Sequence, residues 1–336
     1  MKTGKIMLMA MLGMVVMMAS HVAMASDYKP AVIFDRGGKF DKSFNEGVWN
    51  GVKRFIEETE IEVMEFEVTN DSQREQAMRR MMDRGATALL GVGFAQADAI
   101  NAVAKDYPDK QFAIIDVFWL DLPNLRQYAF KEHEGSYLAG VAAAMTSQTD
   151  KVGFVGGMDI PLIRKFACGY VGGVKSVHAD MEVLQNMTGT TPAAWNDPAK
   201  GAELTKSQID RGADIVYQAA GGTGLGVIQA AADAGKLAIG VDSNQNHIAP
   251  GHVLTSMLKR VDLAAYQFLM DTREGNFSNG VITLGVKEGG VDLAMDEHNK
   301  PLLSDEALEA VKKAKQAIID GAISVHNYET DSQCPY

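Results

Sequence analysis

The chain has 336 residues, of which 46% are hydrophobic and 22% are charged. This composition excludes a disordered protein, and the length suffices for about two domains of ordinary size. The 43 acidic residues outnumber the 32 basic residues, which gives a formal net charge of −11 and argues against a surface that binds nucleic acid.

The first 25 residues have the pattern of a cleaved secretory signal peptide. Lys2 and Lys5 supply positive charge, residues 6–18 form an apolar run, and the sequence Ala-Met-Ala at 23–25 is a cleavage signal. We therefore expect a mature chain that begins at Ser26 and is exported to a bacterial periplasm, with 30 basic against 43 acidic residues, a net charge of −13. No Cys follows the apolar run to take a lipid, so a lipoprotein is not expected.

Short β-branched or aliphatic runs alternate with amphipathic segments from Pro30 onward, which is the pattern of parallel α/β layers. Gly85 and Pro108 follow two of the amphipathic segments and are common helix stop signals. The strands predicted in this first series are residues 31–34, 61–68, 88–92, 112–116 and 125–130, and the helices are residues 43–57, 72–84 and 95–106. Together they predict one α/β lobe.

A second, similar series follows a predicted helix at residues 134–147. Its strands are residues 152–155, 182–187, 215–219 and 237–241, and its helices are residues 161–178, 198–211 and 224–234. The remaining elements are strands at 253–258 and 281–286 and helices at 262–273 and 305–321. They are too few for a third domain, so we expect them to complete the two lobes. The chain would then cross between the lobes more than once, which makes a hinge.

Three acids directly follow apolar strand runs: Asp35, Asp116 and Asp242. In open parallel α/β sheets, ligands bind beyond the carboxyl ends of the strands. Any one Asp at such a place can equally be a helix cap or a turn residue, but three facing one cleft would form a set of acceptors. Such a set suits a ligand with vicinal hydroxyl groups or a cation. Calcium is the weaker alternative, because no run of closely spaced Asp residues occurs, and we expect no metal site.

Aromatic residues near the strand ends form a second group: Phe44, Phe94, Phe118, Trp119 and Trp195. A single aromatic residue is more often part of the core than of a site. Phe44 begins a predicted helix and is the better candidate for a ligand contact. It also lies four residues before Val48, so it can instead extend the buried face of that helix.

The sequence GGTGLG at 221–226 follows a predicted strand and opens a helix, as in dinucleotide-binding folds. The third glycine of that pattern, counted from Gly222, falls on Val227, so no nicotinamide cofactor is expected. A tight turn with helix N–H groups facing the cleft is the structural interpretation. No hydrolase, P-loop or metal-spaced His pattern occurs. Cys168 and Cys334 permit one disulfide in an oxidising compartment, but two unpaired thiols remain equally open.

Several longer segments resemble the basic membrane protein family of ABC-transporter substrate-binding proteins, whose best-understood members are purine nucleoside receptors. The matching segments include DKSFNEG, LLGVGFAQADAI, EGSYLAGVAAAM, GADIVYQAAGGTGLGV, IGVDSNQ and VLTSMLKRVD. The resemblance implies a type I periplasmic-binding-protein fold, with two doubly wound α/β lobes joined by a hinge of three crossovers. We expect residues 26–128 and 246–276 in one lobe and residues 129–245 and 277–336 in the other.

The resemblance also implies a nucleoside site in a protein that is not an enzyme and needs no cofactor, with the permease and ATPase subunits of an ABC importer as partners. Phe44 would stack on the base, and Trp195 would be the opposing aromatic residue. Lys259 would pair with Asp242, one of the carboxylates that hold the ribose. The full set of expected ligand contacts is Asp35, Phe44, Asn45, Gly93, Phe94, Asp116, Trp195, Gly222, Asp242 and Lys259.

Other ligands and roles remain open at the level of the sequence. A sugar, an autoinducer or a flavin-like molecule is an alternative ligand, and the protein can serve sensing rather than transport. An enzyme that acts on nucleosides would need a positioned acid or base, for which no motif is present.

Overall fold

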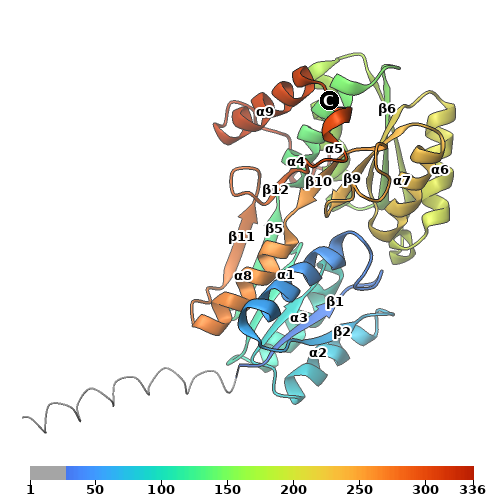
Figure 1. Ribbon diagram of the computed structural model, residues 1–336. Helices are drawn as coiled ribbons and strands as arrows, with labels where there is room; N and C mark the ends of the chain where they lie inside the picture. The colour runs from blue at the N-terminus through green and yellow to red at the C-terminus, as the bar shows by residue number, and fades with distance from the viewer. Residues whose placement is uncertain (1–27) are drawn as a thin grey trace, which may run out of the picture.

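The computed structural model describes residues 28–336 and forms two α/β lobes, each built on a six-stranded sheet (Figure 1). The strand order is β11-β5-β4-β3-β1-β2 in the first lobe and β12-β10-β9-β8-β6-β7 in the second. Neighbouring strands are parallel except β10 and β12. Two doubly wound lobes are therefore confirmed, whereas the expected signal peptide at residues 1–25 lies outside the described residues.

The first lobe has helices on both faces of its sheet. Alternate residues of β1 point to opposite faces, so Val32 packs with the buried stripe of α1, while Ile33 packs with α2 and α3. The strands are β1 (Pro30–Phe34), β2 (Met64–Glu67), β3 (Ala88–Gly91), β4 (Gln111–Ile115), β5 (Leu125–Phe130) and β11 (Gly280–Leu284). The helices are α1 (Phe44–Thr59), α2 (Gln73–Asp83), α3 (Ala97–Asp106) and α8 (Val261–Glu274), with a 3-10 turn η1 (Phe94–Gln96).

The second lobe is organised in the same way and carries the C-terminus. Its strands are β6 (Lys151–Met158), β7 (Glu182–Gly189), β8 (Ile215–Ala219), β9 (Leu237–Asp242), β10 (Val253–Lys259) and β12 (Val291–Leu293). Its helices are α4 (Glu132–Thr146), α5 (Pro161–Val177), α6 (Pro198–Asp210), α7 (Gly224–Asp233) and α9 (Asp305–Ile319). Four 3-10 turns complete it: η2 (Pro192–Trp195), η3 (Gly221–Thr223), η4 (Lys300–Leu302) and η5 (Tyr328–Thr330). Helices α4 and α5 pack closely because Gly140 leaves no side chain between them: a Cβ there would lie 2.8 Å from the amide nitrogen of Val174.

The chain crosses between the lobes three times, from β5 to α4, from β10 to α8 and from β11 to β12. The number of crossings agrees with the expectation, but the boundaries at the second and third crossings were wrong. We expected residues 246–276 in the first lobe, yet β10 pairs with β9 and β12 of the second. We expected residues 277–336 in the second lobe, yet β11 pairs with β5 of the first. The physical reason is that both strands are parallel edge or near-edge additions, and an apolar run does not specify which sheet it joins.

Two side chains in the first turn of α4 connect the three crossings between the lobes. Glu132 forms an ion pair with Lys259, where β10 ends, with 2.9 Å between Oε1 and Nζ. Glu134 Oε2 accepts a hydrogen bond of 2.8 Å from the amide of Val286, just after β11. The hinge is therefore held by two carboxylates that lie two residues apart.

Cys168 of α5 and Cys334 near the C-terminus form a disulfide, with 5.6 Å between their Cα atoms. This decides between the two alternatives that the sequence left open and fits an oxidising compartment. Among residues 28–336, no helix is both long and apolar enough to cross a membrane.

Candidate ligand-binding site

A cavity between the two lobes is lined by nineteen residues, and all ten expected contact residues are among them. They lie where β1, β3 and β4 of the first lobe and β8, β9 and β10 of the second reach their carboxyl ends. The sequence rule that ligands sit beyond strand ends thus brings together residues up to 224 positions apart, from Asp35 to Lys259. The other lining residues, which were not among the expected ligand contacts, are Arg36, Gly37, Asp41, Leu162, Ile163, Phe166, Ala219, Gly221 and Val241.

Asp35 and Phe44 both lie next to Gly93, which has no side chain to keep them apart. Gly93 has φ +92°, and a Cβ there would lie 2.9 Å from Asp35 Oδ2 and 3.5 Å from the Phe44 ring. Arg74 donates to Asp35 Oδ1 over 3.1 Å, and the amide of Asp35 donates to Asn45 Oδ1 over 3.1 Å. Burial nevertheless raises the pKa of Asp35, against the lowering effects of a backbone hydrogen bond and of Arg74. The carboxylate is held in place and faces the cavity.

Asp41 fixes the start of α1, which carries Phe44 and Asn45. Its carboxylate accepts from the amides of Ser43, Asn45 and Glu46 over 2.8, 3.0 and 3.1 Å, and from Asn45 Nδ2 over 3.1 Å. An acid that caps the exposed amides of a helix start orients the side chains of the first turn. Phe44 is half-buried and lines the cavity as the first residue of that turn. The sequence signal for Asp41 was an Asp two residues before Ser43 and the start of an amphipathic helix, but it indicates a cap rather than a site.

Lys259 is a buried cation that lines the cavity and is only 3% exposed. Its Nζ lies 2.7 Å from Asp116 Oδ1 and 2.9 Å from Glu132 Oε1. The carboxylates within ion-pair distance are thus Asp116 and Glu132 rather than the expected Asp242, on which Lys259 still acts by lowering the pKa. Burial by itself would raise the pKa of Glu132, but Lys165 and Lys259 outweigh it and lower the pKa to about 2. Glu132 is therefore ionised and anchors Lys259.

Asp242 links the two lobes at the edge of the cavity. Ser43 Oγ of the first lobe donates to Asp242 Oδ2 over 2.6 Å, and Gln245 Nε2 donates to the carbonyl of Lys42 over 2.9 Å. Burial raises the pKa of Asp242 to about 6, although Lys259 and the Ser43 hydroxyl oppose this. Asp242 and Asp116 have φ +63° and +66°, a left-handed conformation that is uncommon outside glycine and frequent at binding sites.

Trp195 packs against two glycines of the second lobe, Gly157 and Gly221. A Cβ on Gly157 would lie 2.5 Å from Trp195 Cε3, and one on Gly221 would lie 3.9 Å from the same atom. The absence of side chains at these two positions therefore lets the indole settle against the ends of β6 and β8. Apolar side chains of α5 line the cavity beside it: Leu162, Ile163 and Phe166.

Of the other residues that the sequence suggested, two line the cavity and two lie on the surface. Gly222 lines the cavity from the 3-10 turn that precedes α7, in line with the expected tight turn. Phe94 also lines it. Phe118 and Trp119 are 46% and 55% exposed and form an edge-to-face pair on the surface. In the part of the chain that the structure describes, no three His, Cys, Asp or Glu side chains gather in a way that would hold a metal ion.

The family described as "ABC transporter substrate-binding protein PnrA-like" matches residues 29–329. The chain belongs to this family. A relative from Lactococcus lactis named "ABC transporter nucleoside-binding protein BmpA" is 34% identical over 89% of each chain. A second relative, "Basic membrane protein A2" of Borrelia garinii, is 31% identical over 88% of each chain.

Solved structures support the fold. A crystal structure of an ABC transporter solute-binding protein from Aeropyrum pernix K1 superposes with a TM-score of 0.82 at 28% identity, covering 89% of this chain and 93% of that one. A LacI-family regulator from Enterococcus faecium gives a TM-score of 0.59 at 14% identity, with 79% and 97% covered. The type I periplasmic-binding-protein fold is thereby confirmed. As a member of this family, the protein is an extracytoplasmic solute-binding protein of an ABC transporter and not an enzyme.

Proposed function

We propose that this protein captures a purine nucleoside in the periplasm and delivers it to the permease and ATPase subunits of an ABC importer. One observation carries the proposal. A single cavity has aromatic rings from both lobes, Phe44 and Trp195, together with a buried group of carboxylates around Lys259. A planar base suits the aromatic rings, and a ribose suits the carboxylates around Lys259.

The ribose hydroxyl groups match the acceptors of the cavity. Asp116 and Asp242 are buried carboxylates that accept hydrogen bonds only, and vicinal hydroxyls supply donors. The Nζ of Lys259 donates to a hydroxyl oxygen without leaving its carboxylate partners, because an ammonium group has three donors. A hydrogen bond to a charged group contributes about 1.5–3 kcal/mol. Sugar recognition would thus supply much of the binding free energy.

The base is held by stacking and by its polar edge. Stacking of a base on an aromatic side chain is worth about 1–3 kcal/mol. Asp35, which lines the same cavity, would accept a hydrogen bond from the edge of the base, and Asn45 would hold Asp35 in place through its contact with the Asp35 amide. The name of the Lactococcus lactis relative, a nucleoside-binding protein, supports the same ligand class.

Ligand capture would act on the hinge. A ligand that touches both lobes stabilises the closed arrangement over open ones, because only the closed arrangement offers all the contacts. The hydrogen bonds from Ser43 to Asp242 and from Gln245 to Lys42 join the lobes beside the cavity and would form in the same step. The permease then recognises the closed form.

Calorimetry on protein freed of co-purified ligand by unfolding and refolding tests the proposal. We expect heat with guanosine, inosine or adenosine, accompanied by a change in tryptophan fluorescence. Replacing Asp242 by Ala should weaken binding about 10- to 150-fold. Binding of a sugar, an autoinducer or a flavin with no heat from any nucleoside would contradict the proposal. Mass spectrometry of the molecule that co-purifies gives an independent identification.

A further inference from the structure

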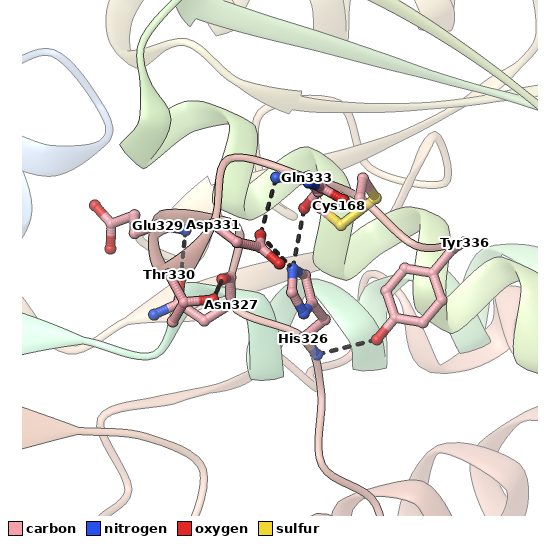
Figure 2. The surroundings of a disulfide bond; sticks show 9 residues. Cys168, His326, Asn327, Glu329, Thr330, Asp331, Gln333 and Tyr336 are labelled. Atoms are coloured by element: carbon pink, nitrogen blue, oxygen red, sulfur yellow. Dashed lines mark hydrogen bonds and ion pairs between the residues drawn. A yellow bond between two sulfur atoms is a disulfide. The ribbon is translucent and has the colours of Figure 1, made fainter.

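The C-terminal segment, residues 325–336, is fastened to α5 of the second lobe (Figure 2). Cys334 is joined to Cys168, and the ring of Tyr336 packs over Gly172, where a Cβ would lie 2.6 Å from the ring. The segment also folds on itself, because the Nε2 of His326 lies 3.1 Å from Asp331 Oδ1 and 3.0 Å from the carbonyl of Gln333. Most of its residues are half-buried or exposed. The disulfide is a covalent anchor of this segment.

This segment ends a row of alternating charges that begins in the ligand cavity. Asp116 pairs with Lys259 over 2.7 Å, Lys259 with Glu132 over 2.9 Å, Glu132 with Lys165 over 2.7 Å, and Lys165 with Glu329 over 2.6 Å. Glu132 is fully buried, and Lys165 is 4% exposed. The two oxygens of Glu132 are divided between the lysines, with Oε1 on Lys259 and Oε2 on Lys165.

We propose that Glu329 is a positioning residue for Lys259 and sets the ligand affinity from outside the cavity. The inference rests on the proposed function in that Lys259 is taken to contact the ligand. With Glu329 present, Lys165 has a carboxylate on each side. Without it, Lys165 is a buried cation whose one remaining charged partner is Glu132. That carboxylate is drawn toward Lys165 and loosens its hold on Lys259, because opposite charges interact strongly where water is excluded.

The disulfide places Glu329 beside Lys165. Only four residues separate Glu329 from Cys334, whereas Cys168 lies three residues after Lys165, so both contacts are made to one face of α5. An exposed terminal segment frays unless it is tied down. Dithiothreitol donates two electrons and two protons to the disulfide, which gives two thiols and leaves oxidised dithiothreitol. Cys334 is exposed and accessible to such a reagent. Reduction should therefore weaken binding as much as the loss of the Glu329 charge does.

Inosine affinity by calorimetry, measured on the mature protein and its variants, tests the inference. Glu329→Gln should weaken binding about 2- to 30-fold, the range typical of coupling through a contiguous network. Glu329→Asp should restore most of the loss, because it restores the charge. Asp331→Asn is the matched control, since it removes one charge from the same segment without touching Lys165. Reduction should weaken the wild type and add nothing to Glu329→Gln. Equal affinities of Glu329→Gln and wild type would overturn the inference, as would equal losses in Glu329→Gln and Asp331→Asn.

A readout without ligand separates this inference from the proposed function. Hydrogen exchange in the ligand-free protein reports on the hinge segments at residues 128–136 and 256–262. We expect faster exchange there in Glu329→Gln than in Asp331→Asn. Unchanged exchange overturns the positioning role. Failure of wild type to bind any nucleoside overturns the proposed function instead and leaves the exchange result to decide the positioning role.

Discussion

A substitution at Gly157 would displace the side chain of Trp195 without replacing that residue. A Cβ at Gly157 would lie 2.5 Å from Trp195 Cε3 and closer still to Cζ3, whereas carbon atoms in contact lie about 3.5–4.0 Å apart. The indole must therefore shift by roughly 1 Å or more in Gly157→Ala. Gly189→Ala is the matched control, because its Cβ would lie 3.5 Å from Ala194, an ordinary contact beside the same 3-10 turn.

The shift should lower nucleoside affinity if Trp195 stacks on the base. Removing the ring in Trp195→Ala should cost about 1–3 kcal/mol, or about 5- to 150-fold in affinity. Gly157→Ala keeps the ring but displaces it, so we expect a smaller loss of at least about threefold. Gly189→Ala should bind within about twofold of wild type, since nothing in the site has to move.

Calorimetry with inosine measures the affinities, and tryptophan emission reports where the ring lies. Of the three Trp residues, Trp49 and Trp119 can be replaced by Phe so that the emission comes from Trp195 alone. Urea unfolding checks that the Gly157→Ala protein is folded. An unchanged affinity of Gly157→Ala, together with an altered emission of the ligand-free protein, would refute the assignment of Trp195 to the base.

Three other substitutions give expected outcomes. Lys259→Met removes the buried cation beside Asp116 and leaves Glu132 with Lys165 as its remaining cation, and it should lower the free energy of unfolding by about 3–5 kcal/mol in urea titrations; a loss below about 1 kcal/mol would contradict the ion pairs. Burial raises the pKa of Asp242 from 3.8 to about 6, so the native state holds this proton more tightly than the unfolded chain does. The stability that the group contributes is thus complete below pH 3.8 and is lost as the pH rises through about 6. Asp242→Asn should match wild type near pH 4 and be up to about 3 kcal/mol more stable above pH 7; a difference that does not vary with pH would show that Asp242 does not titrate as described. Gly93→Ala should weaken ligand binding in calorimetry while the protein stays folded, because the new Cβ displaces Asp35 and φ is positive; wild-type affinity would show that Asp35 does not contact the ligand.

Most elements could be predicted from the sequence, and each predicted boundary of a helix or strand lies within three residues of the observed one. Strands buried on both faces give continuous apolar runs, and Gly or Pro marks the helix ends. Strand β12 was missed because a run of three residues carries no period. The exchange of β10 and β11 between lobes was missed because sheet membership depends on distant partners.

Some residues of the site could also be predicted from the sequence, and others could not. Asp35, Asp116 and Asp242 were predictable, since a polar residue directly after a buried strand faces the cleft in this class of sheet. The ion pair between Lys259 and Glu132 could not be predicted. Glu132 lies 127 positions earlier, at a helix start that has an ordinary acidic first turn. The lining by Phe166 was also hidden, because an apolar residue on an amphipathic helix has the same pattern whether it faces a core or a cavity.

The electrostatics around Asp242 support the proposed closure of the lobes on a ligand. Asp242 is buried and accepts a hydrogen bond from the hydroxyl of Ser43, and burial raises its pKa because it disfavours the charged form. Hydroxyl donors from a ligand would solvate that charge, so part of the binding free energy comes from relieving a cost already present in the protein. The donor at Asp242 is Ser43 of the opposite lobe. If Asp242 contacts the ligand as proposed, relief of its charge and closure of the lobes would be one event, because the same carboxylate is bonded to the first lobe.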